Sequence, residues 1–366
     1  MKSTTQPDYI LLAVIGILVV FGLIMVSSAS ISQSQENFQE SYYYLKGQML
    51  KGLLPGLILG LIAYLIPYRY LKALALPALV VSIIGLILVF VPGISQGHGG
   101  ARRWIALGPL VLQPSEFLKL TFIIYLSAWM ASKGKAIKNF SEGLVPFLLA
   151  VGLVAVLVIM EPDIGTLGVI GFSSLIIFFL AGARISHLGL IGFGSVVLFY
   201  LLSKFYSHAA NRIQVFLHPE LDPQGIGYQI NQATLALGSG GLFGLGLGQS
   251  LQKFRYLPEP ASDSILAVVG EELGFIGIMA LLLLFIIFAF RGLKIAQGAP
   301  DDFGRLLAGG LTGWVVVQAL INMAAICGLI PLTGITLPFI SMGGTSLAVT
   351  LAGMGILLNI SKYSKI

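Results

Sequence analysis

Residues Lys253 to Gly274 read K-F-R-Y-L-P-E-P-A-S-D-S-I-L-A-V-V-G-E-E-L-G and join a long polar segment to an apolar one. Glu259 and Asp263 precede the apolar run, and Glu271 and Glu272 lie inside it. Carboxylates at or within a bilayer are costly and are retained mainly where they have a function. This stretch predicts a membrane helix with acidic residues at its start, and Asp263 is the first candidate for chemistry.

The composition is that of a membrane protein. Of the 366 residues, 57% are hydrophobic and 10% are charged, whereas soluble globular proteins carry about 25% charged residues. Mean hydropathy is +0.94. We therefore expect one polytopic membrane domain over residues 1–366. The single cysteine, Cys327, excludes an intrachain disulfide.

Ten apolar segments are long enough to cross a bilayer, which takes about 20 residues. The fold class predicted is an all-α integral membrane protein with ten transmembrane helices: 9–28, 48–66, 71–91, 115–131, 144–160, 164–181, 186–203, 264–290, 304–329 and 344–361. A large extracytoplasmic loop, residues 204–262, separates helices seven and eight. Within it, Tyr228–Leu237 has helical spacing with polar Gln229, which predicts a short helix on the membrane surface.

The distribution of basic residues predicts the orientation. Short loops on the side of the two termini are basic, so the positive-inside rule makes that side cytoplasmic. On the outer side, Lys46, Lys51 and Lys204 are expected to be solvated loop charges. Other outer basic residues lie beside glycine, proline or acidic residues, which suits an anion site: Arg102, Arg103, Arg212, Lys253 and Arg255.

Asp263 and the Glu116–Lys119 pair each have two interpretations. As the N-cap of the eighth span, Asp263 would accept backbone N–H bonds; as a positioned carboxylate, it could serve as a general base. Glu116 and Lys119 are three residues apart and can pair on one helix face, either as a structural ion pair or as part of a site.

The deeper acids and the glycine-rich segment are also ambiguous. Glu271 and Glu272 point about 100° apart on a helix, so at least one must face the bundle interior. The glycines of Gly238–Gly248 permit either close backbone approach to a phosphate or tight turns.

Motifs over nearly the whole chain carry a family resemblance. They are Ser27–Ser30, Gly100–Ile105, Gln113–Glu116 with Lys119, Glu161–Asp163 with Gly165, Tyr228–Gln229, Gly240–Gly248, Tyr256–Glu259, Asp263, Gly270–Gly274, and Leu337–Ser341 with Gly343–Gly344. Together they resemble the SEDS family (shape, elongation, division, sporulation) of peptidoglycan glycosyltransferases. Gly100–Trp104 and Gly334–Phe339 resemble its division branch, FtsW, more than its elongation branch, RodA. The chain departs from the usual family pattern at Pro260–Ser262, Ser264 and Met342.

The resemblance implies a reaction. Lipid II, a disaccharide-peptide on undecaprenyl diphosphate, is polymerised at the outer face of the bacterial cytoplasmic membrane. An acceptor hydroxyl attacks the anomeric carbon of the donor strand, and the diphosphate leaves with inversion. Asp263 is implied as the base. Substrate contacts are expected at Arg102, Arg103, Trp104, Glu116, Lys119, Asp163, Arg212, Gln229, Lys253, Arg255, Glu259, Glu271 and Ser341.

The resemblance also implies partners and a location. A class B penicillin-binding protein would cross-link the product, other division proteins would join it at the division septum, and no nucleic acid is expected. A divalent cation (Mg²⁺ or Mn²⁺) could share the diphosphate, although no ligand set can be read from the sequence. The alternatives are an elongation-type polymerase, a lipid II flippase with acids along a membrane path, and a scaffold that needs no acid.

Overall fold

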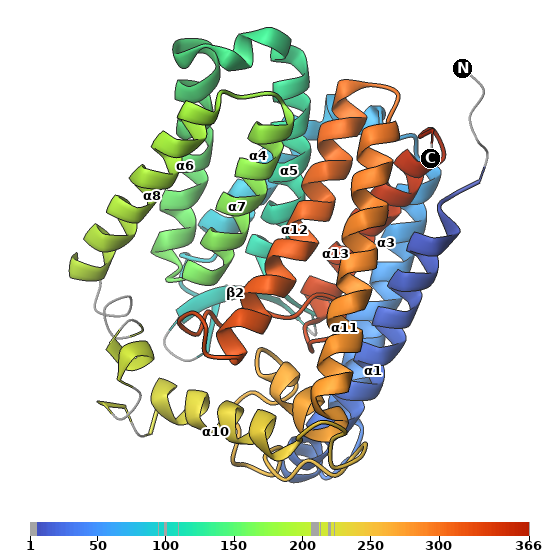
Figure 1. The fold of residues 1–366 in the computed structure, drawn as a ribbon, viewed down its shortest axis with the longest axis vertical. Coiled ribbons are helices and arrows are strands. Elements are labelled where there is room, and N and C mark those ends of the chain that lie inside the picture. The colour runs from blue at the N-terminus through green and yellow to red at the C-terminus, as the bar shows by residue number, and fades with distance from the viewer. Residues whose placement is uncertain are drawn as a thin grey trace.

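The computed structural model describes residues 6–93, 95–98, 101–108, 110–205, 212, 214–218, 221–222 and 224–365; the side chains at 96–98, 101, 102, 107, 110, 198, 199 and 201–205 lie outside the described set. The described helices form a bundle (Figure 1). Their bounds are α1 Tyr9–Phe38, α2 Tyr43–Gln48, α3 Leu54–Leu65, α4 Tyr70–Leu88, α5 Pro114–Lys133, α6 Val145–Met160, α7 Ile164–Leu180, α8 Ile185–Phe205, α10 Ile226–Ser239, α11 Ile265–Gly298, α12 Asp302–Ile326 and α13 Gly344–Ser361. Short π-helical turns precede α3 (Met49–Leu53) and α6 (Phe140–Leu144), and a 3-10 turn, Gly134–Lys138, follows α5.

Each predicted span coincides with a helix, and seven described helices are long and apolar enough to cross a membrane. The seven are Tyr9–Phe38, Tyr43–Leu65, Tyr70–Leu88, Phe140–Met160, Ile265–Gly298, Asp302–Ile326 and Gly344–Ser361. Among the other three, α7 and the apolar part of α8 are shorter, and α5 carries Glu116, Lys119 and Lys133. The fold is therefore an all-α multi-pass membrane protein.

Small residues let the central helices pack closely. In α12 and α13, 78% of the most apolar window is buried inside the bundle. A Cβ on Gly355 would lie 2.1 Å from the carbonyl oxygen of Gly60, so α3 and α13 touch backbone to backbone. Such contacts are typical of membrane helices, which associate through close packing rather than through a hydrophobic driving force.

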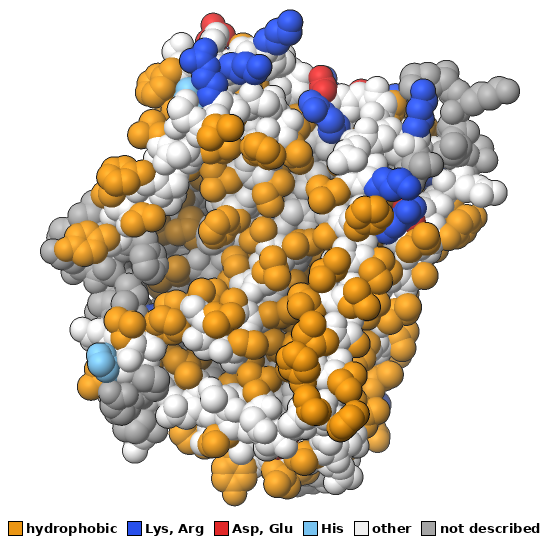
Figure 2. Space-filling model, viewed as in Figure 1, with side chains coloured by type: hydrophobic (Ala, Val, Ile, Leu, Met, Phe, Trp, Pro, Cys, Tyr) orange, Lys and Arg blue, Asp and Glu red, His pale blue; other side chains and the backbone are white. Residues whose placement is uncertain are grey.

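Both termini lie at one end of the bundle, as an even number of spans predicts (Figure 1). The Asp8 backbone N–H donates to Ser361 Oγ at 3.1 Å, and the Asp8 carboxylate pairs with Arg291. In Figure 2, Lys and Arg side chains gather at this same end of the visible face. These contacts join the start of α1 to the ends of α11 and α13.

The opposite end of the bundle holds a small β-sheet, which the all-α prediction missed, and a short helix, which was predicted. β1 (Ser95–His98), β2 (Ala101–Leu107) and β3 (Leu110–Leu112) form a three-stranded antiparallel sheet in the first outer loop. This loop contains several Gly and Pro residues, and strands this short carry little period-2 pattern. The predicted helix at Tyr228–Leu237 is present as α10, which lies across this end of the bundle (Figure 1).

Candidate active site

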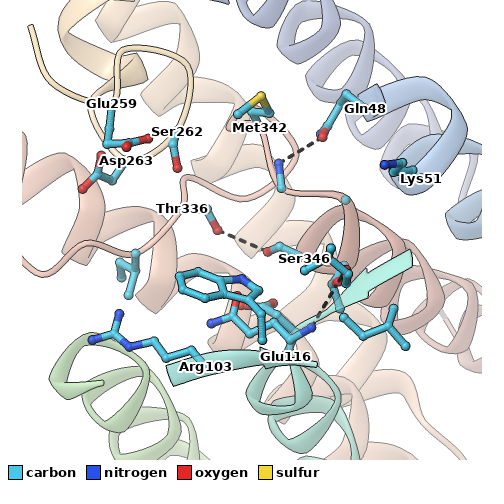
Figure 3. Close-up of a pocket in the computed structure, with 18 of the residues that line it drawn as sticks. Gln48, Lys51, Arg103, Glu116, Glu259, Ser262, Asp263, Thr336, Met342 and Ser346 are labelled. Carbon is cyan, nitrogen blue, oxygen red and sulfur yellow. Dashed lines mark hydrogen bonds between the residues drawn. The ribbon is translucent and has the colours of Figure 1, made fainter. Parts of the chain in front are cut away.

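A cavity of about 570 Å³ lies at the end of the bundle that holds the sheet. Its walls come from α2, β2, β3, the starts of α5, α7 and α13, and the segments that precede α11 and α13. Six predicted site residues line it: Arg103, Trp104, Glu116, Asp163, Glu259 and Asp263. Figure 3 shows Asp263 and Glu259 side by side, with Arg103 on another wall.

Asp263 has a carboxylate that the described residues leave partly unsatisfied. Its Oδ2 accepts a long hydrogen bond from Gln229 Nε2 (3.4 Å), while its Oδ1 is buried and has no partner in the described part of the chain. Burial, followed by the charge of Glu259, raises the pKa of Asp263 to about 6, and the hydrogen bond from Gln229 opposes this shift. A carboxyl group with this pKa is ionised at neutral pH but is a stronger base than an ordinary aspartate.

The capping interpretation of Asp263 is wrong. The first helical residue of α11 is Ile265, and Ser264 occupies the N-cap position without a capping hydrogen bond from its side chain. Ser264 Oγ instead accepts from Gln229 Nε2 at 2.9 Å. α10 thus contacts both Asp263 and its neighbour through one amide group, and the serine that departs from the family pattern supplies one of the two acceptors.

Three hydrogen bonds hold the backbone that carries Asp263. Met342 N donates to the carbonyl oxygen of Ala261 (2.8 Å), Ser341 Oγ to that of Ser262 (2.6 Å), and Asn322 Nδ2 to that of Asp263 (2.9 Å). The segment before α11 is therefore fixed to α12 and to the segment before α13. Ser341 was among the predicted residues, and the structure places it in this scaffold beside the cavity.

Arg103 and Arg212 are held by neutral acceptors. Arg103 donates to the backbone carbonyls of Glu161 (Nε, 3.1 Å) and Pro162, and Arg212 Nη1 donates to those of Leu332 (3.1 Å) and Thr333. Carbonyls orient a guanidinium without cancelling its charge. Burial and the charge of Arg103 lower the pKa of Arg212, and the charges of Asp163 and Asp263 oppose this shift.

The Glu161–Asp163 motif places two acids beside these arginines. Asp163 caps α7 by accepting from Thr166 N at 3.1 Å and also lines the cavity. Glu161 is fully buried, and neither carboxyl oxygen has a partner among the described residues. Burial and the charge of Asp163 raise the pKa of Glu161 to about 8, with Arg103 opposing. Glu161 is therefore mostly protonated at neutral pH, which leaves the local charge more positive.

Glu116 and Lys119 form the predicted pair, with Nζ 2.8 Å from Oε1 and both side chains buried. Lys119 also donates to Gln318 Oε1 at 2.8 Å, and Gln318 in turn donates to the carbonyl oxygen of Thr336. Glu116 Oε2 has no partner in the described residues, and Glu116 lines the cavity. The pair therefore joins α5 to α12 and also contributes to the cavity wall.

The amino-acid sequence matches a known protein family over nearly its whole length. The FtsW/RodA/SpoVE family, described as cell cycle proteins, matches residues 8–366. The chain belongs to this family. It is 42% identical to stage V sporulation protein E of Bacillus subtilis strain 168 over 99% of this chain and 98% of that one. It is 40% identical to a Trichlorobacter lovleyi protein named "Probable peptidoglycan glycosyltransferase FtsW", over 99% and 94%.

Solved structures of the SEDS family have the same fold. A chain from a peptidoglycan synthase complex, studied for the coordination of polymerization and crosslinking, matches with a TM-score of 0.80 and 26% identity over 97% of both chains. The rod shape determining protein RodA of Thermus thermophilus matches with a TM-score of 0.72 and 27% identity over 98% of both chains.

Seven described residues of the predicted site are not among those that line the cavity: Lys119, Arg212, Gln229, Lys253, Arg255, Glu271 and Ser341. In this SEDS chain, Lys253, Arg255 and Glu271 are engaged elsewhere by acids or backbone groups. Lys253 is buried against Glu272 (2.8 Å). Arg255 pairs with Glu36 at the surface. Glu271 accepts hydrogen bonds from Ser250 Oγ and from the backbone N–H groups of Leu251 and Gln252, which lie before α11. The side chain of Arg102 lies outside the described residues.

The sequence analysis missed another part of the cavity wall. Gln48, Lys51, Thr336 and Ser346 line it, and the first two come from α2 and the π-helical turn after it (Figure 3). Lys51 is exposed, as predicted for a loop charge, yet it also faces the cavity. Gln48 donates to the carbonyl oxygen of Ser341 and accepts from Gly343 N. The sequence feature that could have pointed to Gln48 is a polar glutamine at the first position of the predicted span 48–66.

Within the described residues there is no cluster of three or more His, Cys, Asp or Glu side chains arranged to hold a metal ion.

Proposed function

We propose that this chain is a peptidoglycan glycosyltransferase that polymerises lipid II, with Asp263 as its general base. The observation that carries the proposal is the carboxylate of Asp263, whose Oδ1 has no hydrogen-bond partner among the described residues, in a cavity that also presents the charge of Arg103. The names of its relatives support the reaction class. A base and a nearby uncompensated cation are what a displacement with an anionic leaving group requires.

Asp263 would take the proton of the acceptor sugar hydroxyl as that oxygen attacks the anomeric carbon of the donor. The raised pKa makes the carboxylate a better proton acceptor while keeping it ionised at neutral pH. Glu259, in a left-handed backbone conformation (φ 48°), lies beside it and contributes to this shift. The Asp263 backbone is held by three hydrogen bonds, which limits its motion during the reaction.

The diphosphate would leave toward Arg103 and Arg212. Arginine's planar fork suits phosphate oxygens, and the hydrogen bonds of both guanidinium groups go to backbone carbonyls rather than to carboxylates. Because Glu161 is mostly protonated at neutral pH, it does not offset them. Trp104, Asp163 and Lys51 line the same cavity and would contact the sugar or the peptide.

We further propose ten membrane spans with cytoplasmic termini, a cavity on the outer face, and a division role with a class B penicillin-binding protein and other division proteins as partners. The basic residues around the termini support the orientation. Gly100–Trp104 and Gly334–Phe339 support the division branch. An elongation-type or sporulation-type polymerase would use the same cavity and differ in partner.

The test is polymerisation of purified lipid II by the purified chain, read as glycan polymer on a gel. Asp263→Asn should bind lipid II yet lose about 10²-fold or more of the activity, since general base catalysis contributes about 10²–10⁴. Wild-type activity should rise as pH passes about 6. Asp222→Asn is the matched control, because the one side-chain hydrogen bond that the described residues give Asp222 is from the Ile226 backbone near the start of α10.

Near wild-type activity of Asp263→Asn would end the assignment and make Glu259 the next candidate base. Transfer of lipid II across vesicles by a chain that forms no polymer would favour the flippase. A chain that shows neither polymerisation nor lipid II transfer but binds a transpeptidase normally would favour the scaffold.

A further inference from the structure

Two polar clusters mark the ends of the apolar parts of α1 and α11. At the end with the termini, Arg291 Nε donates to Asp8 Oδ2 at 2.8 Å. At the other end, Lys253 Nζ lies 2.8 Å from Glu272 Oε1 and 2.9 Å from Ser28 Oγ. About 20 residues separate the clusters on each helix, or about 30 Å at 1.5 Å per residue. A hydrocarbon core is about 30 Å thick, so the Glu272 cluster lies at its edge.

The glycine-rich loop Gly240–Gly248 is bonded to α11 at this level. Leu245 N donates to the carbonyl oxygen of Glu271 at 2.9 Å, and Ile276 N donates to that of Leu242 at 3.1 Å. The loop therefore lies against the first turns of α11 at the membrane edge, on the side opposite the termini.

The glycines serve this close approach. Gly244 has φ +80°, and a Cβ there would lie 2.2 Å from the carbonyl oxygen of Glu272. A Cβ on Gly240 would lie 2.0 Å from that of Gly270. The helix itself kinks at Gly274, which has φ 68°. Side chains would push the loop away from α11, so the tight-turn reading of this segment accounts for its glycines.

The loop directs its large apolar side chains outward. Their exposed fractions are 62% for Leu242, 79% for Phe243, 45% for Leu245 and 57% for Leu247. They adjoin the exposed apolar face of α11, which includes Phe275, Ile276, Met279 and Leu283; Figure 2 shows hydrophobic side chains covering the visible side of the bundle. A contiguous exposed apolar patch marks an interaction surface.

We propose that the loop Gly240–Gly248 is a lipid anchor, which buries Leu242, Phe243, Leu245 and Leu247 among phospholipid acyl chains just below the headgroups. The occupant is lipid because the loop lies at the hydrocarbon edge and continues the apolar face of a spanning helix. Aromatic and aliphatic side chains favour this boundary. The anchor fixes the height of the segment that leads to Asp263, and it does not depend on the proposed reaction.

The test uses spin labels on single cysteines in a Cys327→Ser background, reconstituted into vesicles of phosphatidylethanolamine and phosphatidylglycerol. Labels go at Phe243→Cys, at Leu283→Cys as the lipid-facing control and at Lys46→Cys as the water-facing control. Collision with oxygen reports lipid, and collision with a nickel chelate reports water. The label at residue 243 should resemble the one at 283, with oxygen favoured over nickel.

A label at residue 243 that favours nickel would overturn the proposal, because the loop would then lie in water. A label shielded from both reagents would also overturn it, since contact with a second copy or another protein would give that result. Adding Gly244→Ala should move the label at 243 toward the nickel-accessible pattern, whereas Gly238→Ala, with nothing within 4 Å of its Cβ, should not. A Gly244→Ala chain that fails to fold leaves the label comparison as the deciding measurement.

Discussion

Asp263 and the pair Glu271–Glu272 come from one short stretch of sequence but have opposite surroundings. Glu272 accepts from Ser28 Oγ at 2.6 Å and from Lys253 Nζ at 2.8 Å, and the oxygens of Glu271 also have donors. Asp263 Oδ2 receives a long side-chain hydrogen bond from Gln229, the backbone of Asp263 and Ser264 also stabilises the carboxylate, and Oδ1 has no partner among the described residues. The deeper carboxylates are satisfied, and the shallower one is not.

Among these three acids, hydrogen-bond satisfaction rather than membrane depth separates the structural pair from the candidate catalytic residue. Buried polar groups in folded proteins are nearly all hydrogen-bonded, so an unpaired one requires an explanation. Groups whose pKa is shifted by burial and a like charge in a cleft are functional candidates. The same rule applies to the basic residues: Lys253 and Arg255 have acidic partners, whereas Arg103 and Arg212 contact carbonyls.

The largest effect is expected at the buried ion pair between Lys253 and Glu272. Lys253→Met should lower the free energy of unfolding by about 3–5 kcal/mol, because it leaves Glu272 charged and buried without its cation. Lys253→Met combined with Glu272→Leu should recover much of this loss. Denaturant titration in detergent measures both. A single variant as stable as wild type would mean that water reaches Glu272, and the contrast with Asp263 would then fail.

The next effect concerns Arg103, whose hydrogen bonds go to carbonyl oxygens and which has no acidic partner in the described part of the chain. Arg103→Ala should reduce lipid II polymerisation by about 10- to 100-fold, since a hydrogen bond to a charged group is worth about 1.5–3 kcal/mol. Arg103→Lys keeps the positive charge but lacks the planar guanidinium, so its polymerisation activity should lie between those of the wild type and Arg103→Ala. Steady-state kinetics with melting temperatures on the same samples separate substrate use from folding. Unchanged kinetics in both Arg103→Ala and Arg212→Ala would assign the arginines to loop packing.

Asp263→Asn should raise stability, opposite to the loss of about 1 kcal/mol expected of a broken N-cap. The folded-state pKa of about 6 lies above the ordinary aspartate value of 3.8, so the stabilising contribution of the protonated form is lost as pH rises through 6. The full shift corresponds to about 3 kcal/mol, and partial exposure reduces the expected gain above pH 6 to about 1–2 kcal/mol. Melting curves at pH 4 and pH 8 should differ accordingly; a loss at pH 8 would restore the capping interpretation.

The sequence predicted elements whose signal is local. Apolar length located the helices, and helical spacing located α10 and the Glu116–Lys119 pair. It could not predict which basic residue meets which acid, because Lys253 pairs with Glu272 through a turn that the glycines of the preceding loop make possible. Asn322 was missed for the same reason: a single amide in an apolar helix has no motif, and its acceptors are backbone carbonyls from two other segments.

The smallest effect should be at Arg255, which was predicted to bind the diphosphate. Its guanidinium pairs with Glu36 at the surface, where the two side chains are 73% and 40% exposed. Exposed ion pairs contribute about 0–1 kcal/mol and are weakened by salt. Arg255→Ala should therefore change lipid II turnover by less than about twofold, and Glu36→Gln should behave alike. If Arg255→Ala instead reduced turnover as far as Arg103→Ala, an acidic partner would not disqualify a cation from the site, because substrate could displace Glu36 from an exposed pair far more easily than Glu272 from a buried one.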